Sequence, residues 1–225
     1  RIGQCIMTCP TTAAFNALPE AKRQLKVGRS LRFFGDGFQK RDDLYERKVW
    51  RIPVMEGEFI IEESFGMKKG IAGGMFLILA EDAEAGLRAA VRAGEAARAA
   101  AGVALPFPGG ICCSVSKVGS RKYKLGASTN DAFCPSLRDA IEGSQVPEEV
   151  TSVYEIVING INFECVRESV AKAIDAATRM PGIVKITSSN YGGRLGPYKL
   201  QLSDVVKRSY RCLMADTLRS SHCES

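Results

Sequence analysis

The amino-acid sequence predicts an α+β fold, because strand-like and helix-like segments alternate over most of the chain. Two segments, 82–103 and 163–180, have apolar or small residues at helical spacing. Runs of apolar residues typical of strands flank them, at 70–82, 111–119, 152–160 and 182–193. A strand-helix-strand order therefore occurs twice, which is typical of a ferredoxin-like split βαβ sandwich with helices on one face of an antiparallel or mixed sheet.

The first part of the chain, residues 1–53, is heterogeneous and carries weaker signals. A short helix is expected within 11–25, where threonines offer an N-cap. Gly35-Asp36-Gly37 indicates a turn between aromatic residues. Alternating apolar residues then predict two strands, at 48–54 and 56–66.

The Ala-rich segment 82–103 is predicted to be a helix that begins after an N-cap at Asp82 and ends at a C-cap formed by Gly102. Leu87, Val91 and small residues such as Ala97 are expected to face the core. The second helix, 163–180, ends where Pro181-Gly182 follows it.

Two segments complete the chain after the second helix and the strand that follows it. Residues 196–205 alternate in polarity and predict another strand. The period-two pattern stops after residue 206, and 207–225 is polar, so we expect an irregular tail there.

Composition limits the function classes. The 225 residues carry a net charge of +6, but the basic residues are scattered and no nucleic-acid motif accompanies them. No apolar run is long enough to span a bilayer. We expect a cytoplasmic protein that binds neither nucleic acid nor membrane.

Cysteine and histidine content limits the chemistry. The eight cysteines include no CxxC pair, and the single histidine is His222, so no metal site is expected. Histidine-dependent nucleophilic catalysis would need a residue at the end of the chain. Acid–base chemistry is therefore left to carboxylates, lysine, tyrosine or backbone groups.

Three small-residue segments each have a structural and a functional interpretation. The Pro/Gly segment 105–111 forms a turn or a backbone-lined pocket wall. Residues 126–135 supply turns and caps or hydrogen bonds to a polar ligand. Segment 188–200 is a hairpin connection or an anion site in which Arg194 takes part.

Glu155 interrupts the apolar face of the strand at 152–160, on the same face as Val153 and Val157. A carboxylate on such a face is costly unless it is paired, hydrated or neutralised. Three interpretations follow from periodicity: an ion pair with the next strand, a solvent-facing position, or a cleft acid with a raised pKa.

Long blocks of this sequence strongly resemble one enzyme family, the formylmethanofuran–tetrahydromethanopterin formyltransferases. The similarity runs from Arg1 to about Val205. The blocks that carry it include LRFFGDGF, RKVWRIPVMEGEFIIEESFG, GIAGG, PFPGGICCSVSKVGS, ASTNDAFCP, VYEIVINGIN and PGIVKITSSNYGGRLGPYKL.

The resemblance implies an acyltransferase (EC 2.3.1 type) of one-carbon metabolism and methanogenesis. It would move a formyl group between formylmethanofuran and N5 of tetrahydromethanopterin, both of them substrates, with no permanently bound cofactor and no metal. The family's proposed catalytic glutamate falls at Glu155, which we expect to act as a general acid.

Substrate contacts are expected from three groups of residues. Phe107, Gly109 and Gly110 would form a wall of the site. Ser128, Thr129 and Asn130 would supply polar contacts. Cationic side chains would bind the carboxylates and phosphate of the substrates, and these are Lys117, Arg121 and Arg194.

The resemblance also implies a two-lobed fold whose first lobe is incomplete here, as in an N-terminally truncated chain. Residues 1–53 would be the remainder of the N-terminal lobe, 54–206 the C-terminal formyltransferase lobe, and 207–225 the irregular tail. A homodimer or homotetramer is expected, with a formylmethanofuran hydrolase as a further partner. The alternative function is a non-catalytic scaffold subunit of such a formyltransferase/hydrolase complex.

Overall fold

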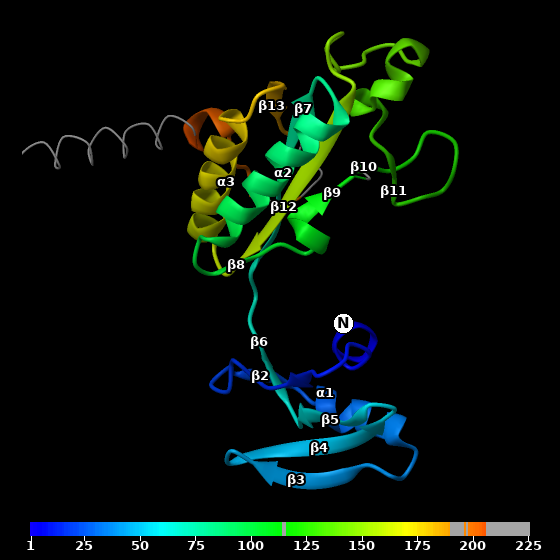
Figure 1. Ribbon diagram of the computed structural model, residues 1–225, viewed down its shortest axis with the longest axis vertical. Helices are drawn as coiled ribbons and strands as arrows, with labels where there is room; N and C mark the ends of the chain where they lie inside the picture. The colour runs from blue at the N-terminus through cyan, green and yellow to red at the C-terminus, as the bar shows by residue number, and fades with distance from the viewer. Residues whose placement is uncertain (114–115, 190–195, 197, 206–225) are drawn as a thin grey trace, which may run out of the picture. The chain divides into compact units, whose positions relative to one another are not determined.

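The computed structural model describes residues 1–113, 116–189, 196 and 198–205 (Figure 1). The chain divides into two compact units between Lys69 and Gly70. Each unit is described by itself. Among the described residues, no helix is both long enough and apolar enough to cross a membrane.

The first unit is built on a small sheet with the strand order β1-β5-β4-β3. Its strands are β1 (Ala13–Ala14), β3 (Lys40–Leu44), β4 (Arg47–Val54) and β5 (Gly57–Glu62). A separate two-stranded ladder joins β2 (Arg23–Leu25) to β6 (Phe65–Met67). Three short helical turns accompany the sheet: η1 (Ile2–Ile6), α1 (Val27–Leu31) and η2 (Arg32–Gly35).

The core of this unit is formed by buried residues of three strands, Ala14, Ile52, Phe59 and Ile61. The strand predicted at 48–54 is confirmed as β4. The helix predicted within 11–25 is wrong, because this segment instead contributes β1 and β2 to the two sheets. Pairing with distant strands outweighs the local capping signal there.

The second unit contains a larger antiparallel sheet with the order β13-β7-β12-β8, in which β9 also pairs with β12. Its strands are β7 (Ile71–Ala80), β8 (Val103–Ala104), β9 (Ile111–Cys112), β12 (Ser152–Gly160) and β13 (Ile183–Thr187). The helices α2 (Ala83–Arg98) and α3 (Phe163–Thr178) pack on one face. The fold is therefore mixed α/β.

The segment between β9 and β12 consists of short elements. The strands β10 (Ser116–Val118) and β11 (Ala127–Thr129) form a hairpin. Among the described residues of the second unit, three 3₁₀ turns are present: η3 (Pro108–Gly110) before β9, then η4 (Asp131–Phe133) and η5 (Pro135–Ala140) after the hairpin.

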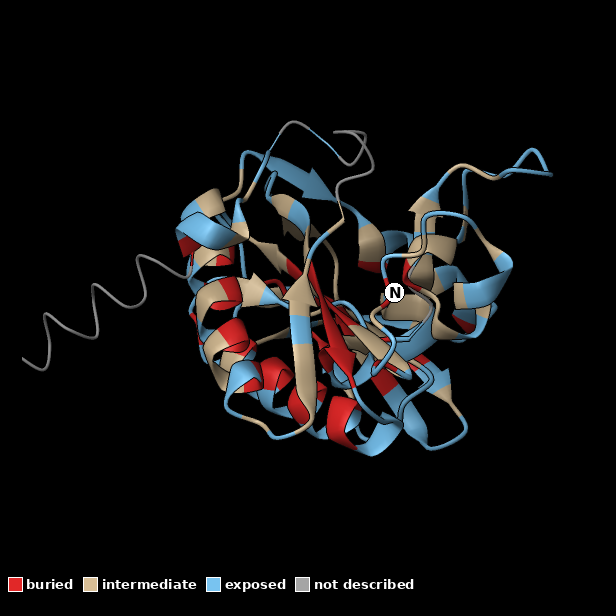
Figure 2. Cartoon of the chain, turned by 90° about the horizontal axis from the view of Figure 1, so that it is seen from above, coloured by how far each residue is buried: buried red, intermediate tan, exposed pale blue. Residues whose placement is uncertain are grey.

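The main core lies between the helices and the sheet (Figure 2). Phe76, Ile78, Ile156 and Ile158 point from β7 and β12 toward the helices and are fully buried. The alternation along the strands brings every second residue to this face. Glu155 directly precedes Ile156 in β12 and therefore faces the opposite side of the sheet.

Helix α2 begins as predicted, since the Asp82 carboxylate accepts a hydrogen bond from the backbone N–H of Ala85 at 2.7 Å. The helix ends at Arg98, earlier than predicted, and Gly102 takes a positive φ of 74° in the turn beyond it.

The buried face of α2 differs from the prediction. Leu87 and Val91 are 47% and 40% exposed, so their expected core positions are wrong. Only small residues face the core: Ala85, Gly86, Ala89, Ala90, Ala93, Gly94 and Ala97. They allow close packing, as at the hydrogen bond from the Ser169 hydroxyl of α3 to the Ala97 carbonyl.

Helix α3 begins after Asn162, whose side-chain oxygen accepts a hydrogen bond from the Cys165 backbone N–H. The strand predicted at 196–205 is wrong for its described part, where 198–201 lie in no strand and 202–205 form a helical turn. The predicted tail, 207–225, lies outside the described residues.

The boundary between the two compact units, after Lys69, falls later in the sequence than the predicted lobe boundary after residue 53. Strand β5 pairs with β4 from Val49 to Val54, so the residues after 54 stay with the first unit up to Lys69. The predicted division into an N-terminal remainder and a C-terminal lobe stays a prediction.

Candidate active site around Glu155

Glu155 lies in β12, the strand that pairs with β7 on one side and with β8 and β9 on the other. Directly opposite it are Leu77 of β7 and Cys112 of β9. The side chain is on the face that points away from the helices, and the residue is only 9% exposed. It is a buried carboxyl group in the interior of a sheet.

Burial raises the pKa of the Glu155 carboxyl above its ordinary value, because the charged form loses its hydration. A hydrogen bond with the Cys112 thiol acts in the opposite direction and lowers the pKa, but burial is the larger effect. No ion pair of Glu155 is found within the described part of the chain. Burial and the raised pKa agree with the third interpretation drawn from periodicity, while the cleft and the acid–base role stay a prediction.

The face around Glu155 is covered by an apolar cluster. Leu77 and Leu79 of β7 pack there with Phe133, Val146 and Val150 from the segment that precedes β12. Leu77 is the register partner of Glu155, so the cluster and the carboxyl group share one face of the sheet. The predicted polar residues Ser128, Thr129 and Asn130 precede Phe133 by only a few positions in the sequence, with Asp131 between them.

In the predicted wall, Gly109 and Gly110 belong to η3, Phe107 is the N-cap residue before it, and the turn leads directly into β9. Both glycines have positive φ, 64° and 82°, a conformation that other residues rarely adopt. Phe107 is 40% exposed, whereas Gly110 is buried. The turn therefore sets the start of the short strand that carries Cys112 to Glu155.

Helix α2 holds this turn in place. The Arg98 guanidinium donates a hydrogen bond to the Gly109 carbonyl at 2.5 Å. A Cβ atom at Gly94 would lie 2.9 Å from that same oxygen, so only glycine allows the helix to approach so closely.

The two described cations predicted to bind substrate are engaged with one carboxylate. The Lys117 ammonium lies 2.6 Å from Asp131 Oδ1, and the Arg121 guanidinium lies 3.4 Å from Oδ2. The Lys117 hydrogen bond is the main reason why the pKa of Asp131 is lowered. Arg121 remains largely exposed, at 72% of its side chain. The third predicted cation, Arg194, lies outside the described residues.

The predicted polar contacts, Ser128, Thr129 and Asn130, lie at the end of the β10–β11 hairpin. Ser128 is opposite Lys117, and its hydroxyl donates a hydrogen bond to the Gly119 carbonyl at 2.7 Å. Thr129 is exposed and Asn130 is buried, at 3%. The hairpin thus groups these residues with Lys117, while Phe107 and the glycines belong to the β9 side.

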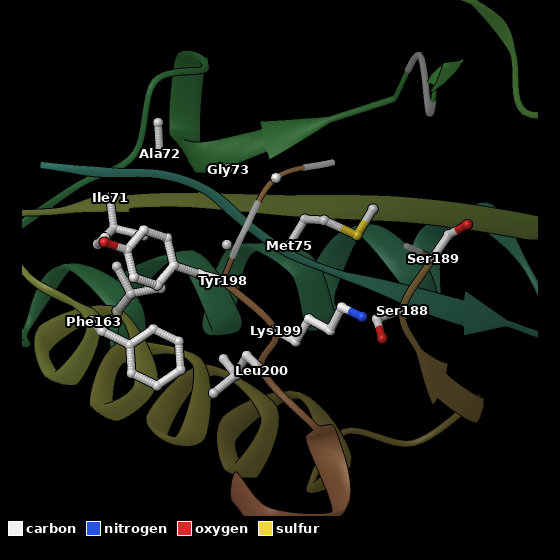
Figure 3. Close-up of a pocket in the computed structure, with 13 residues that line it drawn as sticks. Ile71, Ala72, Gly73, Met75, Phe163, Ser188, Ser189, Tyr198, Lys199 and Leu200 are labelled. Carbon is white, nitrogen blue, oxygen red and sulfur yellow. The ribbon is translucent and has the colours of Figure 1, made fainter. Parts of the chain in front are cut away.

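Sequence reasoning missed two features. One is the thiol of Cys112, whose only sequence signal is its place in a strand next to a second cysteine. The other is a cavity of about 130 Å³ at the edge of β7 (Figure 3). None of the described residues predicted to bind substrate lines it, and the glycines of β7 were its available signal.

Within the described ranges, no three His, Cys, Asp or Glu residues come together in a way that would hold a metal ion.

Comparison with known proteins points to one family over residues 1–54 and 57–205. The family described as "FTR, proximal lobe" matches residues 57–205, and the family described as "Formylmethanofuran-tetrahydromethanopterin formyltransferase" matches residues 1–54. A formylmethanofuran–tetrahydromethanopterin formyltransferase from Methanopyrus kandleri is 54% identical over 208 residues, which are 91% of this chain and 69% of that protein.

Two solved structures are similar to the chain. A formylmethanofuran:tetrahydromethanopterin formyltransferase from Methanosarcina barkeri aligns with a TM-score of 0.76 and 46% identity. The formyltransferase/hydrolase complex from Methylorubrum extorquens, solved with methylofuran, aligns with a TM-score of 0.74 and 45% identity. Both alignments cover 91% of this chain and 69% of the matched chain.

Proposed function

The chain belongs to the formylmethanofuran–tetrahydromethanopterin formyltransferase family, and on that premise we propose that it transfers a formyl group between formylmethanofuran and N5 of tetrahydromethanopterin. The observation that carries the proposal is the 54% identity to a formyltransferase over 91% of the chain. The buried acid at Glu155 supports it with a group suited to the chemistry.

The reaction exchanges one amine of a formamide for another. In the forward direction, N5 attacks the formyl carbon and a tetrahedral intermediate with an oxyanion forms. The bond between that carbon and the methanofuran nitrogen then breaks. The proton lost from N5 is balanced by the proton that the departing amine gains, so neither an external reductant nor a side-chain nucleophile is required.

Glu155 is assigned as the general acid of this sequence. Its raised pKa keeps a proton on the carboxyl group at pH values where an exposed glutamate would be ionised. The protonated group donates a hydrogen bond to the developing oxyanion or delivers a proton to the leaving amine. The Cys112 thiol holds the carboxyl group from the neighbouring strand.

Substrate contacts remain assigned as the sequence predicts. The turn formed by Phe107, Gly109 and Gly110 is proposed as a wall, since it leads into the strand opposite Glu155. Lys117, Arg121 and the polar residues of the hairpin are proposed to bind the anionic parts of the carriers. Binding there requires a substrate anion to compete with Asp131 for its two cations.

The architecture and the assembly are proposed in the same way. The strand order β13-β7-β12-β8/β9 supports a ferredoxin-like split βαβ arrangement of the second unit. A homodimer or homotetramer is proposed, with a formylmethanofuran hydrolase as partner. The similar structure from Methylorubrum extorquens, a formyltransferase/hydrolase complex, supports that partner.

The second candidate function is that of a scaffold subunit without activity, and the only observation related to it is that the similar structure is a formyltransferase/hydrolase complex. The two are separated by assaying the purified chain, alone and with a hydrolase partner, for formyl transfer from formylmethanofuran to tetrahydromethanopterin. Turnover that depends on both carriers supports the enzyme. Stable assembly with the hydrolase and no turnover in either preparation supports the scaffold.

A further inference from the structure

The large sheet opens at one edge. Strand β13 pairs with β7 only from Ala80 to Leu77, and its own last paired residue is Thr187. Beyond this point the chain leaves β7 and borders a cavity of about 130 Å³ (Figure 3). The lining residues come from β7, α3 and the segment after β13: Ile71, Ala72, Gly73, Gly74, Met75, Phe163, Val166, Ser188, Ser189, Gly196, Tyr198, Lys199 and Leu200.

One end of the cavity is aromatic. The rings of Phe163 and Tyr198 stack with their centroids 6.0 Å apart and their planes 29° from parallel. Ile71 lies beside them (Figure 3). Stacked or offset aromatic rings offer a flat apolar surface to a further ring.

The other end of the cavity is polar and cationic. Figure 3 shows the Lys199 ammonium directed toward the hydroxyl of Ser188, with Ser189 nearby. Lys199 makes no ion pair within the described residues, and no aspartate or glutamate is among the residues that line the cavity. The charge on the described lining is therefore positive and suits an anion.

Gly73 leaves the backbone of β7 accessible from the cavity, between its aromatic end and its cationic end. Its φ is 81°, and a Cβ atom built there would meet nothing within 4 Å. Its N–H donates to the Asn159 side-chain oxygen at 2.9 Å, which fixes the glycine in this conformation. A ligand can thus approach the backbone of β7 closely.

We propose that this cavity is a binding site for a single planar aromatic ring that bears a carboxylate. The ring stacks against Tyr198 and Phe163, and the carboxylate pairs with Lys199 and the serine hydroxyls. The volume is close to that of an apolar cavity of about 150 Å³ that takes up benzene. The proposal does not depend on formyl transfer, because none of the described residues assigned to that reaction lines the cavity.

Benzoate is a suitable probe, and its binding to the full chain is measured by calorimetry or by chemical-shift changes of the tyrosine ring. Acetate, which lacks the ring, and benzamide, which lacks the charge, are the matched ligands. Benzoate is expected to bind about tenfold or more tightly than either. Equal affinity for benzoate and acetate, or for benzoate and benzamide, overturns the proposal.

Variants test the residues. Lys199→Met and Tyr198→Ala should each weaken benzoate about tenfold or more, while Lys185→Met, an exposed lysine of β13 outside the cavity, should leave binding unchanged. Thermal unfolding of each variant checks that the fold is retained. Benzoate binding that survives both cavity variants, or that Lys185→Met abolishes, would place the site elsewhere.

Discussion

Glu155 and Cys112 face each other across two antiparallel strands, and the thiol is a hydrogen-bond partner of the carboxyl group. Both residues are buried, at 9% and 7% exposure. The acid therefore titrates under two opposed influences, burial and a single hydrogen bond. Each influence can be changed separately by mutation.

Replacing Cys112 by alanine should move the pH dependence of kcat/KM. The thiol lowers the pKa of Glu155, so its loss should raise that pKa further. A general acid is active while protonated, and activity falls as pH rises through its pKa. The alkaline limb of the profile should therefore shift to higher pH in Cys112→Ala. Cys113→Ala, at the exposed neighbour, is the control and should leave the limb in place; an unchanged limb in both variants would remove the thiol from the mechanism.

Replacing Glu155 by glutamine keeps the size of the side chain and removes the transferable proton. Turnover should fall by about 10²–10⁴-fold, the usual contribution of general acid catalysis, with little change in substrate affinity. The matched control is Glu149→Gln at an exposed position. Steady-state kinetics with both carriers measure the effect, and a Glu155→Gln enzyme within a few-fold of the parent would exclude the acid role.

The same substitution should change how stability depends on pH. The pKa of Glu155 is raised in the folded state above the ordinary 4.5, so folding favours the protonated form. Its stabilising effect is complete below the unfolded-state pKa and is lost as pH rises through the folded-state value. Relative to Glu155→Gln, the parent should lose unfolding free energy as pH increases above 4.5. Urea unfolding over a pH series measures this, and parallel curves for the two proteins would contradict it.

Gly94→Ala tests the contact between α2 and the turn before β9. Alanine usually stabilises a helix by about 1 kcal/mol relative to glycine. Here the added Cβ would lie 2.9 Å from the Gly109 carbonyl oxygen, and backbone must move to relieve the contact. We expect a net destabilisation of about 1–3 kcal/mol. Thermal unfolding measures it, with Arg98→Met, which removes the hydrogen bond to the same oxygen without adding a Cβ, as the comparison; a stabilised Gly94→Ala protein would refute the close approach.

The strongly periodic elements of the second unit could be predicted from the sequence. The apolar and small side chains of β12 and of both helices repeat at the spacing of a strand or a helix in the sequence. Asp82 caps its helix as its position indicates. Glu155 could be singled out for the same reason, since a carboxylate breaks the strand's alternation.

The errors arise where tertiary packing outweighs local pattern. Leu87 and Val91 have the hydrophobicity of core residues, but the close contact with α3 and the sheet selects the alanines and glycines beside them. Likewise, Cys112 gains its role only through a pairing with a strand that lies far along the chain. No local pattern contains that pairing. The ion pairs that Asp131 makes with Lys117 and Arg121 are also set by the hairpin rather than by composition.

The two strands that meet at the acid differ greatly in length. Strand β12 spans nine residues and is paired on both sides, whereas β9 has only two residues and follows a glycine turn. Short strands with few hydrogen bonds open at lower free energy than long central ones. Amide hydrogen exchange should thus be slow at Ile156 and fast at Cys112. Local opening of β9 would then release the thiol while the carboxyl group stays in β12, and each opening would remove the hydrogen bond that lowers the pKa of Glu155.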